Sequence, residues 1–289
     1  MVIEFKNVDH IYDDAAADGM KALSDVNLKV ESNEFIGVIG ATGSGKSTLM
    51  QHMNGLLKAS GGTITFDGKN IYDKDFSLKK LREHVGLVFQ YPEHQLFEMT
   101  VFDDVCFGPK NQGLEPDEIK ARATDALKLT GIGDEYFDVS PFDLSGGQKR
   151  RVAIAGVLAM CPDIMILDEP AAGLDPAGKR EIFESIRSLR KESGIAVILV
   201  SHSMEDVAEY VDRLIVMDKG RIVFDDTPVN VFKHADELEA IGLAAPEVTY
   251  ILRDLKNAGL DVDCDAITVE SANDEIMNAL GRIRDSQDR

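Results

Sequence analysis

The stretch GATGSGKST, residues 40–48, constrains the fold of this chain more than any other part of the sequence. It fits the pattern G-x-x-x-x-G-K-[ST], and it stands between an apolar run and a helical pattern, the context that confirms a phosphate-binding loop. Glycines let successive backbone N–H groups point at phosphate oxygens, and the start of the following helix adds positive potential. The sequence therefore predicts a nucleoside triphosphate site made of Gly40, Ala41, Thr42, Gly43, Ser44, Gly45, Lys46, Ser47 and Thr48.

Two side chains of this loop have predicted chemical roles. Lys46 supplies a cation for the outer phosphates, and Ser47 offers a hydroxyl group to Mg²⁺. The motif identifies the kind of ligand but does not say what hydrolysis drives.

Alternation of short apolar runs with longer helical patterns predicts an α/β fold with a largely parallel sheet. Four runs are continuously apolar, as expected for strands that are covered on both faces: 35–40, 85–89, 163–168 and 195–200. Two hairpins are predicted at Asp67-Gly68 and Lys219-Gly220. With the runs VIEFKNV and VNLKV near the N-terminus, they indicate an antiparallel layer beside the parallel core.

The residue pattern of the sequence changes twice along the chain. Residues 92–160 are mainly helical in pattern. From about residue 236 we expect a small helical appendage with a short strand, in which Pro246 opens a helix and Gly259 closes one. The last dozen residues are polar, and we expect them to be disordered.

Composition excludes several classes of protein. The 289 residues are 44% hydrophobic, enough for a full core, and the formal net charge of −20 disfavours binding to nucleic acid. The three cysteines lie far apart and form no metal or disulfide framework. No signal peptide is evident at the N-terminus, and the longest apolar run, 152–161, is too short to cross a bilayer.

Polar side chains directly follow the predicted strands, at the edge where open α/β sheets bind ligands. Asp168 is placed to hold Mg²⁺, and Glu169 to accept a proton from the attacking water. Gln90 can coordinate the metal or the water, and His202 can sense the γ-phosphate. Taken alone, a glutamine or histidine after a strand is more often structural. Tyr12 can stack on a base, although a core or surface tyrosine is the alternative.

A second phosphate-binding loop is indicated by FDLSGGQKRR, residues 142–151. Ser145 has the character of a helix N-cap, and Gly146 and Gly147 expose N–H groups. This loop lies in the helical segment, away from the first, so the two are not expected to hold one nucleotide within a chain. If two chains pack head to tail, each second loop closes on the γ-phosphate of the other chain. Asp175 can carry information across such an interface.

In order along the chain, these motifs resemble those of the ATP-binding cassette ATPases, over roughly residues 1–235: Gly40–Thr48, Gln90, LSGGQ (144–148), IMILDEP (164–170), GLD (173–175) and His202. The resemblance implies a RecA-like P-loop NTPase core with an antiparallel β-subdomain and a helical subdomain at about 92–160. It implies that Gln148 shares in nucleotide binding, and that Tyr12 stands where the family keeps its adenine-stacking aromatic residue.

A narrower resemblance, carried by MQHMNGLLKASGGTI, FQYPEHQLFEMTVFDDVCFGPKNQG and SGGQKRRVAIAGVLAM, is to the ATPases of energy-coupling factor transporters, which import vitamins and transition-metal ions. Thr42 and FGPKN favour the second of the two paralogous types, and residues 236–289 are similar to the family's C-terminal dimerisation domain. The implied partners are a paralogous cassette ATPase, a transmembrane subunit T and exchangeable substrate-binding membrane subunits S. The implied location is the cytoplasmic face of the cell membrane.

One residue departs from the pattern, since Ala171 stands where many relatives have threonine, which leaves the interface packing there open. Other interpretations remain. They are a homodimeric ATPase of a dedicated cobalt, nickel or other importer, and a cassette ATPase outside transport. A kinase is disfavoured because LSGGQ and His202 would have no task.

Overall fold

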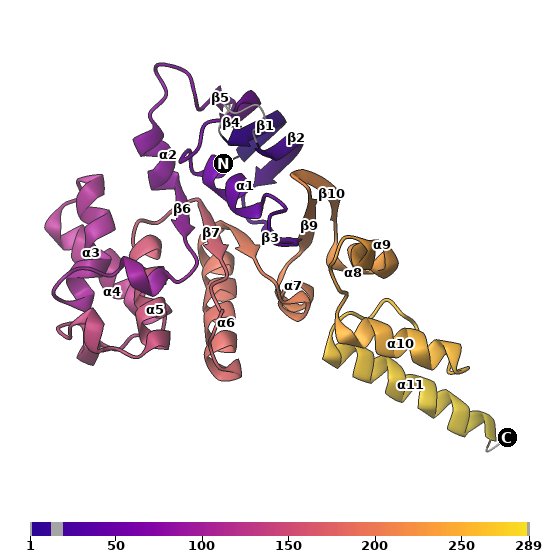
Figure 1. Ribbon diagram of the computed structural model, residues 1–289. Coiled ribbons are helices and arrows are strands. Elements are labelled where there is room, and N and C mark those ends of the chain that lie inside the picture. The colour runs from indigo at the N-terminus through magenta and orange to yellow at the C-terminus, as the bar shows by residue number, and fades with distance from the viewer. Residues whose placement is uncertain (1, 13–19, 288–289) are drawn as a thin grey trace.

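The computed structural model describes residues 2–12 and 20–287, and side chains as far as residue 282 (Figure 1). Residues 13–19, which follow Tyr12, lie outside the described residues. Figure 1 shows the parallel sheet at the centre, a small β-layer above it, and a group of helices to one side. A helical pair lies at the opposite end.

The central sheet has six strands in the order β10-β9-β3-β8-β7-β6, and its first five strands along the chain, β3 to β9, are parallel. β10 pairs with β9 in antiparallel fashion through the expected hairpin. The prediction of a parallel α/β core is confirmed. The strands are β3 (Phe35–Gly40), β6 (Val85–Val88), β7 (Ile164–Asp168), β8 (Ala196–Val200), β9 (Arg213–Asp218) and β10 (Arg221–Asp226).

Alternation of side chains explains why β3, β6, β7 and β8 are apolar along nearly their whole length. Met165 and Leu167 of β7 join the hydrophobic cluster on one face of the sheet, and Ile164 and Ile166 join the cluster on the other. Successive residues of a strand point to opposite faces, so a sheet covered on both sides has no position for a polar residue. In these four strands the polar side chain, that of Asp168, comes at the end of its strand.

The second sheet is antiparallel, with the order β2-β1-β4-β5. Its strands are β1 (Val2–Tyr12), β2 (Met20–Glu31), β4 (Gly61–Phe66) and β5 (Lys69–Asn70). The hairpin at Asp67-Gly68 is confirmed, because β4 pairs with β5 there and both turn residues have positive φ. Ile3, Phe5 and Ile64 of this layer pack in the same cluster as Leu49 and Met50, so the layer covers the phosphate-binding helix.

The helices up to residue 240 divide into two groups. α3, α4 and α5 pack on one another beside β6, and the remaining helices cover the sheet or follow it (Figure 1). The helices are α1 (Lys46–Met53), α2 (Leu78–His84), α3 (Val101–Gln112), α4 (Pro116–Leu129), α5 (Gly146–Leu158), α6 (Pro176–Ser193), α7 (Met204–Tyr210), α8 (Pro228–Phe232) and α9 (Ala235–Ala240). Three short 3₁₀ turns are η1 (Pro92–Gln95), η2 (Asp134–Tyr136) and η3 (Pro141–Asp143).

The C-terminal part is a helical pair, α10 (Glu247–Asn257) and α11 (Val269–Gln287), with its own small hydrophobic cluster. Pro246 caps α10, and Gly259 follows its end with φ 96°, as expected. The expectation of a short strand is wrong, since residues 258–268 form turns and irregular backbone, and no strand among the described residues pairs with them. The end of the chain is expected from the sequence to be disordered, and α11 is described as far as residue 287.

Candidate functional site

The carboxyl ends of β3, β8 and β7 bring three predicted segments to one edge of the sheet. Val200 of β8 pairs with Val38 of β3 on one side and with Asp168 of β7 on the other. The phosphate-binding loop, residues 201–202 and residues 168–169 therefore begin at the same level of adjacent strands. β6 is the outer neighbour of β7, and Gln90 follows two residues after its end with an exposed side chain.

The phosphate-binding loop is preformed between β3 and α1. Lys46 Nζ donates to the carbonyl oxygens of Gly40 and Ala41, at 2.6 and 3.1 Å, so the buried ammonium group lies folded over the loop. Burial lowers the pKa of Lys46, and the negative charges of Glu169 and Asp168 oppose that shift. The lysine is therefore poorly solvated and ready to exchange two carbonyl oxygens for phosphate oxygens.

Asp168 and Glu169 form the acidic side of the site. Burial raises the pKa of both carboxyl groups, although Lys46 and His202 act in the opposite direction. His202 Nε2 lies 3.2 Å from Glu169 Oε1, near enough for attraction. The two atoms form no hydrogen bond, and this buried oxygen has no hydrogen-bond partner within residues 2–12 and 20–282. Buried carboxylate oxygens normally have a hydrogen-bond partner, so this one lacks a partner that another group would supply.

The backbone of Glu169 is held in a conformation that non-glycine residues seldom adopt. Its φ is 55°, and its N–H donates to the carbonyl oxygen of Val200 at 3.0 Å. Strain of this kind persists only where the surrounding structure fixes it, and it clusters at functional sites. The turn after β7 thus fixes where the Glu169 carboxylate points.

Tyr12 lies close to the phosphate-binding helix, at the end of β1. Its hydroxyl group is 3.2 Å from Thr48 Oγ1, and its ring meets His10 edge to face at 4.6 Å between centroids. The tyrosine is partly exposed, which leaves ring surface open for stacking. The structure thus brings Tyr12 next to the loop; whether it stacks on adenine remains a prediction.

The second loop begins α5, and the prediction that Ser145 is an N-cap is confirmed. Ser145 Oγ accepts from the N–H of Gln148, and Gln148 Oε1 accepts from the N–H of Ser145, at 3.3 and 3.0 Å. This reciprocal pair is a capping box. Ser145 and Gly146 are exposed, and α5 packs on α3, α4, η1 and β6, whereas α1 packs on β2 and β3. The two loops therefore belong to different packed layers.

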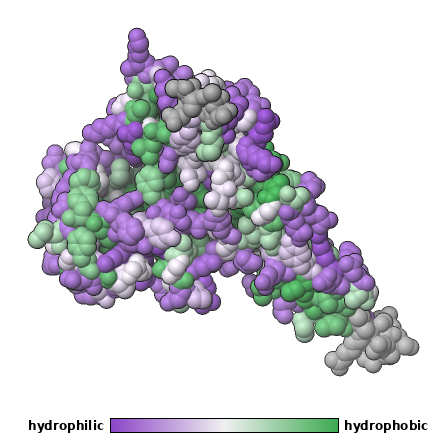
Figure 2. Space-filling model, in the orientation of Figure 1, coloured by the Kyte–Doolittle hydropathy of each residue, from purple (hydrophilic) through white to green (hydrophobic). Residues whose placement is uncertain are grey.

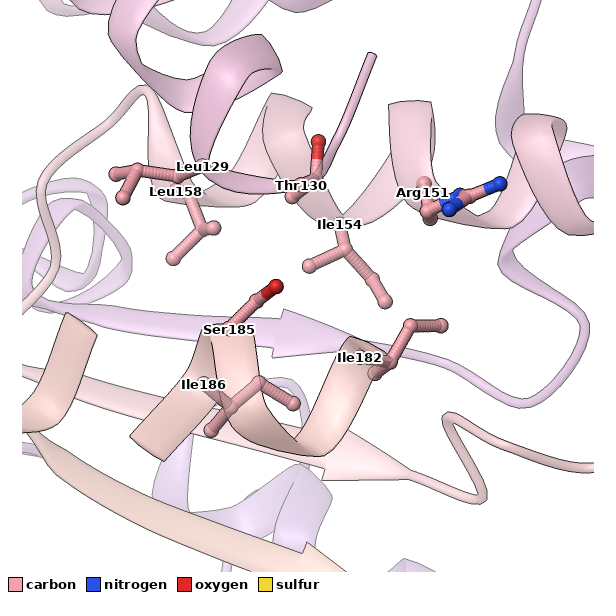
Figure 3. Close-up of a pocket in the computed structure, with 8 residues that line it drawn as sticks. All are labelled: Leu129, Thr130, Arg151, Ile154, Leu158, Ile182, Ser185 and Ile186. Atoms are coloured by element: carbon pink, nitrogen blue, oxygen red, sulfur yellow. The ribbon is translucent and has the colours of Figure 1, made fainter. Parts of the chain in front are cut away.

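The helical group meets the core along an apolar seam between α5 and α6 (Figure 3). Figure 3 shows Ile154 and Leu158 of α5 on one side and Ile182 and Ile186 of α6 on the other. Beside them, Arg151 reaches Glu181 of α6 at 2.6 Å. Because the seam is formed by short branched side chains, few directional bonds fix the helical group on the core at this place.

Two residues of the site were not singled out from the sequence, Glu93 and Arg150. Arg150 is 4% exposed, on α5, and donates to both carboxylate oxygens of Glu93 and to the carbonyl oxygen of Ala172. A signal was present, because Arg150 lies four residues before Ile154 and so shares its buried helix face. A charge at such a position needs a buried partner.

The donor set suits Mg²⁺ in chemistry. Ser47, Gln90 and Asp168 offer a hydroxyl, an amide and a carboxylate oxygen, the hard ligands that this ion prefers together with phosphate and water. The side chain of Asp168 makes no hydrogen bond in the described part of the chain, so its oxygens are free for a ligand. No group of three or more His, Cys, Asp or Glu side chains there could hold a metal alone, so the ion would arrive with the nucleotide.

The fold, the loop and the strand-end carboxylates define this chain as an ATP-binding cassette ATPase. Residues 23–172 match the protein family described as "ABC transporter". A curated relative from Caldanaerobacter subterraneus subsp. tengcongensis, "Energy-coupling factor transporter ATP-binding protein EcfA2", is 51% identical over 280 residues, 97% of this chain and 98% of the relative. The chain belongs to the EcfA2 family of energy-coupling factor transporter ATP-binding proteins.

Solved structures agree with this assignment. That of cbiO1 from Clostridium perfringens, described as "part of the ABC transporter complex cbiONQ", has a TM-score of 0.73 and 40% identity and covers 89% of this chain and 97% of its own. The cassette MJ0796, solved as a dimer in "a post-hydrolysis state" bound to ADP and Pi, has a TM-score of 0.70 and 30% identity, covering 78% and 98%.

Proposed function

We propose that this chain hydrolyses Mg-ATP at composite sites formed head to tail with a paralogous cassette ATPase. Hydrolysis drives uptake of vitamins or transition-metal ions through a transmembrane subunit T and exchangeable substrate-binding subunits S. The protein lies at the cytoplasmic face of the cell membrane, bound to these partners. Residues 1–235 form the nucleotide-binding domain, and residues 236–289 the dimerisation domain.

The observation that carries the proposal is the separation of the two phosphate-binding loops. The first lies between β3 and α1, and the second is an exposed capping turn on the helical group. The second loop offers hydrogen-bond donors from Ser145, Gly146, Gly147 and Gln148. A nucleotide held by the first loop of the same chain would not use them. A second cassette in head-to-tail orientation would bring its γ-phosphate to them, and the cassette MJ0796 was also solved as a dimer.

In the proposed mechanism, the residues of this chain act in sequence. Lys46 leaves the carbonyl oxygens of Gly40 and Ala41 for the outer phosphates, and Tyr12 stacks on adenine. Glu169 accepts a proton from the attacking water at its unpartnered Oε1. His202 orients that carboxylate and contacts the γ-phosphate.

Ser47, Gln90 and Asp168 would hold Mg²⁺. When bound, the ion neutralises the charge on the outer phosphates. Burial raises the pKa of Asp168, and a cation at its carboxylate would oppose that shift.

An apolar surface on the segment that follows Gln90 in the chain supports a membrane partner. Phe97, Met99 and Phe107 are exposed on the loop before α3 and on α3 itself, where Figure 2 shows a hydrophobic patch. Phe97 and Phe107 meet edge to face at 4.9 Å, which fixes the shape of this surface. None of the helices in the described part of the chain has both the length and the apolarity that crossing a bilayer requires. A docked subunit would therefore supply the membrane path.

The C-terminal helices support dimerisation. Ile251 of α10 and Val269, Met277 and Leu280 of α11 are large, apolar and exposed, and Figure 2 shows hydrophobic surface along this pair. Exposed apolar patches of this kind mark protein interaction sites. A homodimer with one dedicated permease is the second candidate, favoured by the likeness to cbiO1 of the cbiONQ complex.

Purification of the tagged chain from its native membranes in mild detergent, with identification of the bound proteins by mass spectrometry, tests the proposal. We expect a second cassette ATPase, one T-type membrane protein and several small, unrelated membrane proteins. A homodimer with a single permease would favour the second candidate. A soluble complex with ribosomes or DNA would refute a role in transport.

A further inference from the structure

Arg150 forms a buried three-way junction close to the site. Its Nη2 lies 3.1 Å from Glu93 Oε1 and its Nε lies 3.3 Å from Glu93 Oε2, so the guanidinium fork holds both carboxylate oxygens. Nη1 donates to the carbonyl oxygen of Ala172. Two-point pairing of this kind fixes the direction of both side chains as well as their separation.

The three joined segments each follow a residue of the predicted site. Glu93 in η1 is three residues after Gln90, and Ala172 is three residues after Glu169. Arg150 itself is two residues after Gln148, in the first turns of α5. The segments are far apart in the sequence, since 57 residues separate Glu93 from Arg150 and 22 separate Arg150 from Ala172.

The backbone near the junction adopts conformations that residues other than glycine seldom adopt. Tyr91 and Glu169 both have positive φ, 56° and 55°, although neither is glycine. Gly147 of the second loop also approaches this region, because a Cβ on it would lie 3.5 Å from Leu174. Two strained turns and the start of α5 thus lie within a few residues of one junction, which adds directional bonds to the Arg151–Glu181 pair beside the apolar seam of Figure 3.

We propose that Arg150 is a positioning residue that couples the segment after Gln90, the second phosphate-binding loop and the turn after Glu169. This inference deepens the proposed function and rests on it: a partner docked beside η1 would shift Glu93, and the junction would carry that shift to both loops. Arg150 does not bind the nucleotide of its own chain. Its loss therefore lowers the rate of hydrolysis and leaves ATP affinity unchanged.

Two variants break the junction from opposite sides, and the neighbouring ion pair gives matched controls. Arg150→Lys keeps the charge but loses the fork, and Glu93→Gln keeps the shape but loses the charge. Arg151→Lys and Glu181→Gln make the same changes in a pair that joins α5 to α6 at a more exposed place. The first readout is amide hydrogen exchange of the full chain without partners.

In that experiment, each junction variant should raise exchange in residues 91–99 and 170–175 together, while the controls leave both segments unchanged. Faster exchange throughout the chain, or in one segment alone, would overturn the coupling. Because this readout requires no partner and no ATP hydrolysis, it stands even if the proposed function fails.

The second readout is ATP hydrolysis by the complex purified from membranes. We expect kcat to fall about tenfold or more in both junction variants, the scale expected when catalytic groups are misplaced. The KM for ATP should stay constant, and the double variant should be no slower than either single variant. If the wild-type complex hydrolyses ATP and the junction variants match the controls, or if they change KM alone, the inference is wrong and the proposed function stands.

Discussion

At the scale of single residues, the site depends on carboxyl groups that are partly removed from water. Burial raises the pKa of Asp168 and Glu169, and Lys46 and His202 limit that rise. These groups could be named from the sequence because polar residues directly after buried strands stand out. The junction of Arg150 with Glu93 could not, because it depends on the tertiary contact of segments 57 residues apart.

Glu169→Gln tests the general base. The amide keeps the size of the side chain but cannot accept the proton, so we expect hydrolysis to slow by about 10²- to 10⁴-fold with ATP binding retained. Steady-state hydrolysis and nucleotide titration measure the two effects. Hydrolysis at the wild-type rate would assign the base to another residue.

His52 provides a test of how pH acts on stability. It is fully buried in α1, its Nδ1 lies 2.7 Å from the carbonyl oxygen of Thr48, and its Nε2 has no described partner. Burial lowers the pKa of His52 below its ordinary value. The unfolded chain therefore takes up the proton more readily, and stability is lost as pH falls through about 6.5, the ordinary histidine value, towards the lowered one.

We expect His52→Asn to reduce this dependence, since its amide can still donate to the Thr48 carbonyl oxygen but does not titrate. The measurement is the free energy of unfolding in urea at pH 7.5 and 5.5. The difference between the two values should be smaller in the variant than in the wild type. An equal or larger difference would show that other groups cause the loss in acid.

At the scale of elements, the turn between β3 and α1 depends on glycine at a position where backbone packs on backbone. Gly45 has φ 104°, and a Cβ there would lie 2.5 Å from the carbonyl oxygen of Ala22 in β2. Gly43 has φ 81°, but a Cβ there would meet nothing within 4 Å. Comparison of the two positions thus separates the free-energy cost of a positive φ from the cost of a steric clash.

We expect Gly43→Ala to cost about 1–2 kcal/mol, the penalty of the left-handed region, and Gly45→Ala to cost clearly more. The contact partner in β2 is backbone in a sheet and cannot move aside. Thermal unfolding of both variants gives the comparison. Equal losses would mean that the loop relaxes away from β2.

Elements were predictable where one physical rule decided them. The four buried strands appear as continuous apolar runs because both faces of the sheet are covered, and the hairpins follow from Asp67-Gly68 and Lys219-Gly220. The strand expected in the C-terminal part failed for a different reason. Val262 and Ile267 are buried there, but within residues 2–12 and 20–287 no strand lies beside them to share backbone hydrogen bonds.

At the scale of the whole molecule, the two phosphate-binding loops are separated within one chain. In the proposed composite site, the second loop of one chain meets the first loop of another. The helical group carries the second loop, the core carries the first, and the C-terminal pair lies apart from both (Figure 1). The sequence order of the motifs indicated this arrangement. Their partner cannot be read from one chain, because its half of each site lies in another sequence.

Ser145→Asp tests the composite site most directly. Aspartate keeps the N-cap of α5 but places a negative charge where the γ-phosphate of the other chain would lie. The measurement is ATP affinity of the isolated chain, paired with hydrolysis by the assembled complex. We predict unchanged affinity and a rate that falls by roughly half or more, because one of two sites loses its second loop. Weaker ATP binding by the isolated variant, or an unchanged rate in the complex, would contradict composite sites.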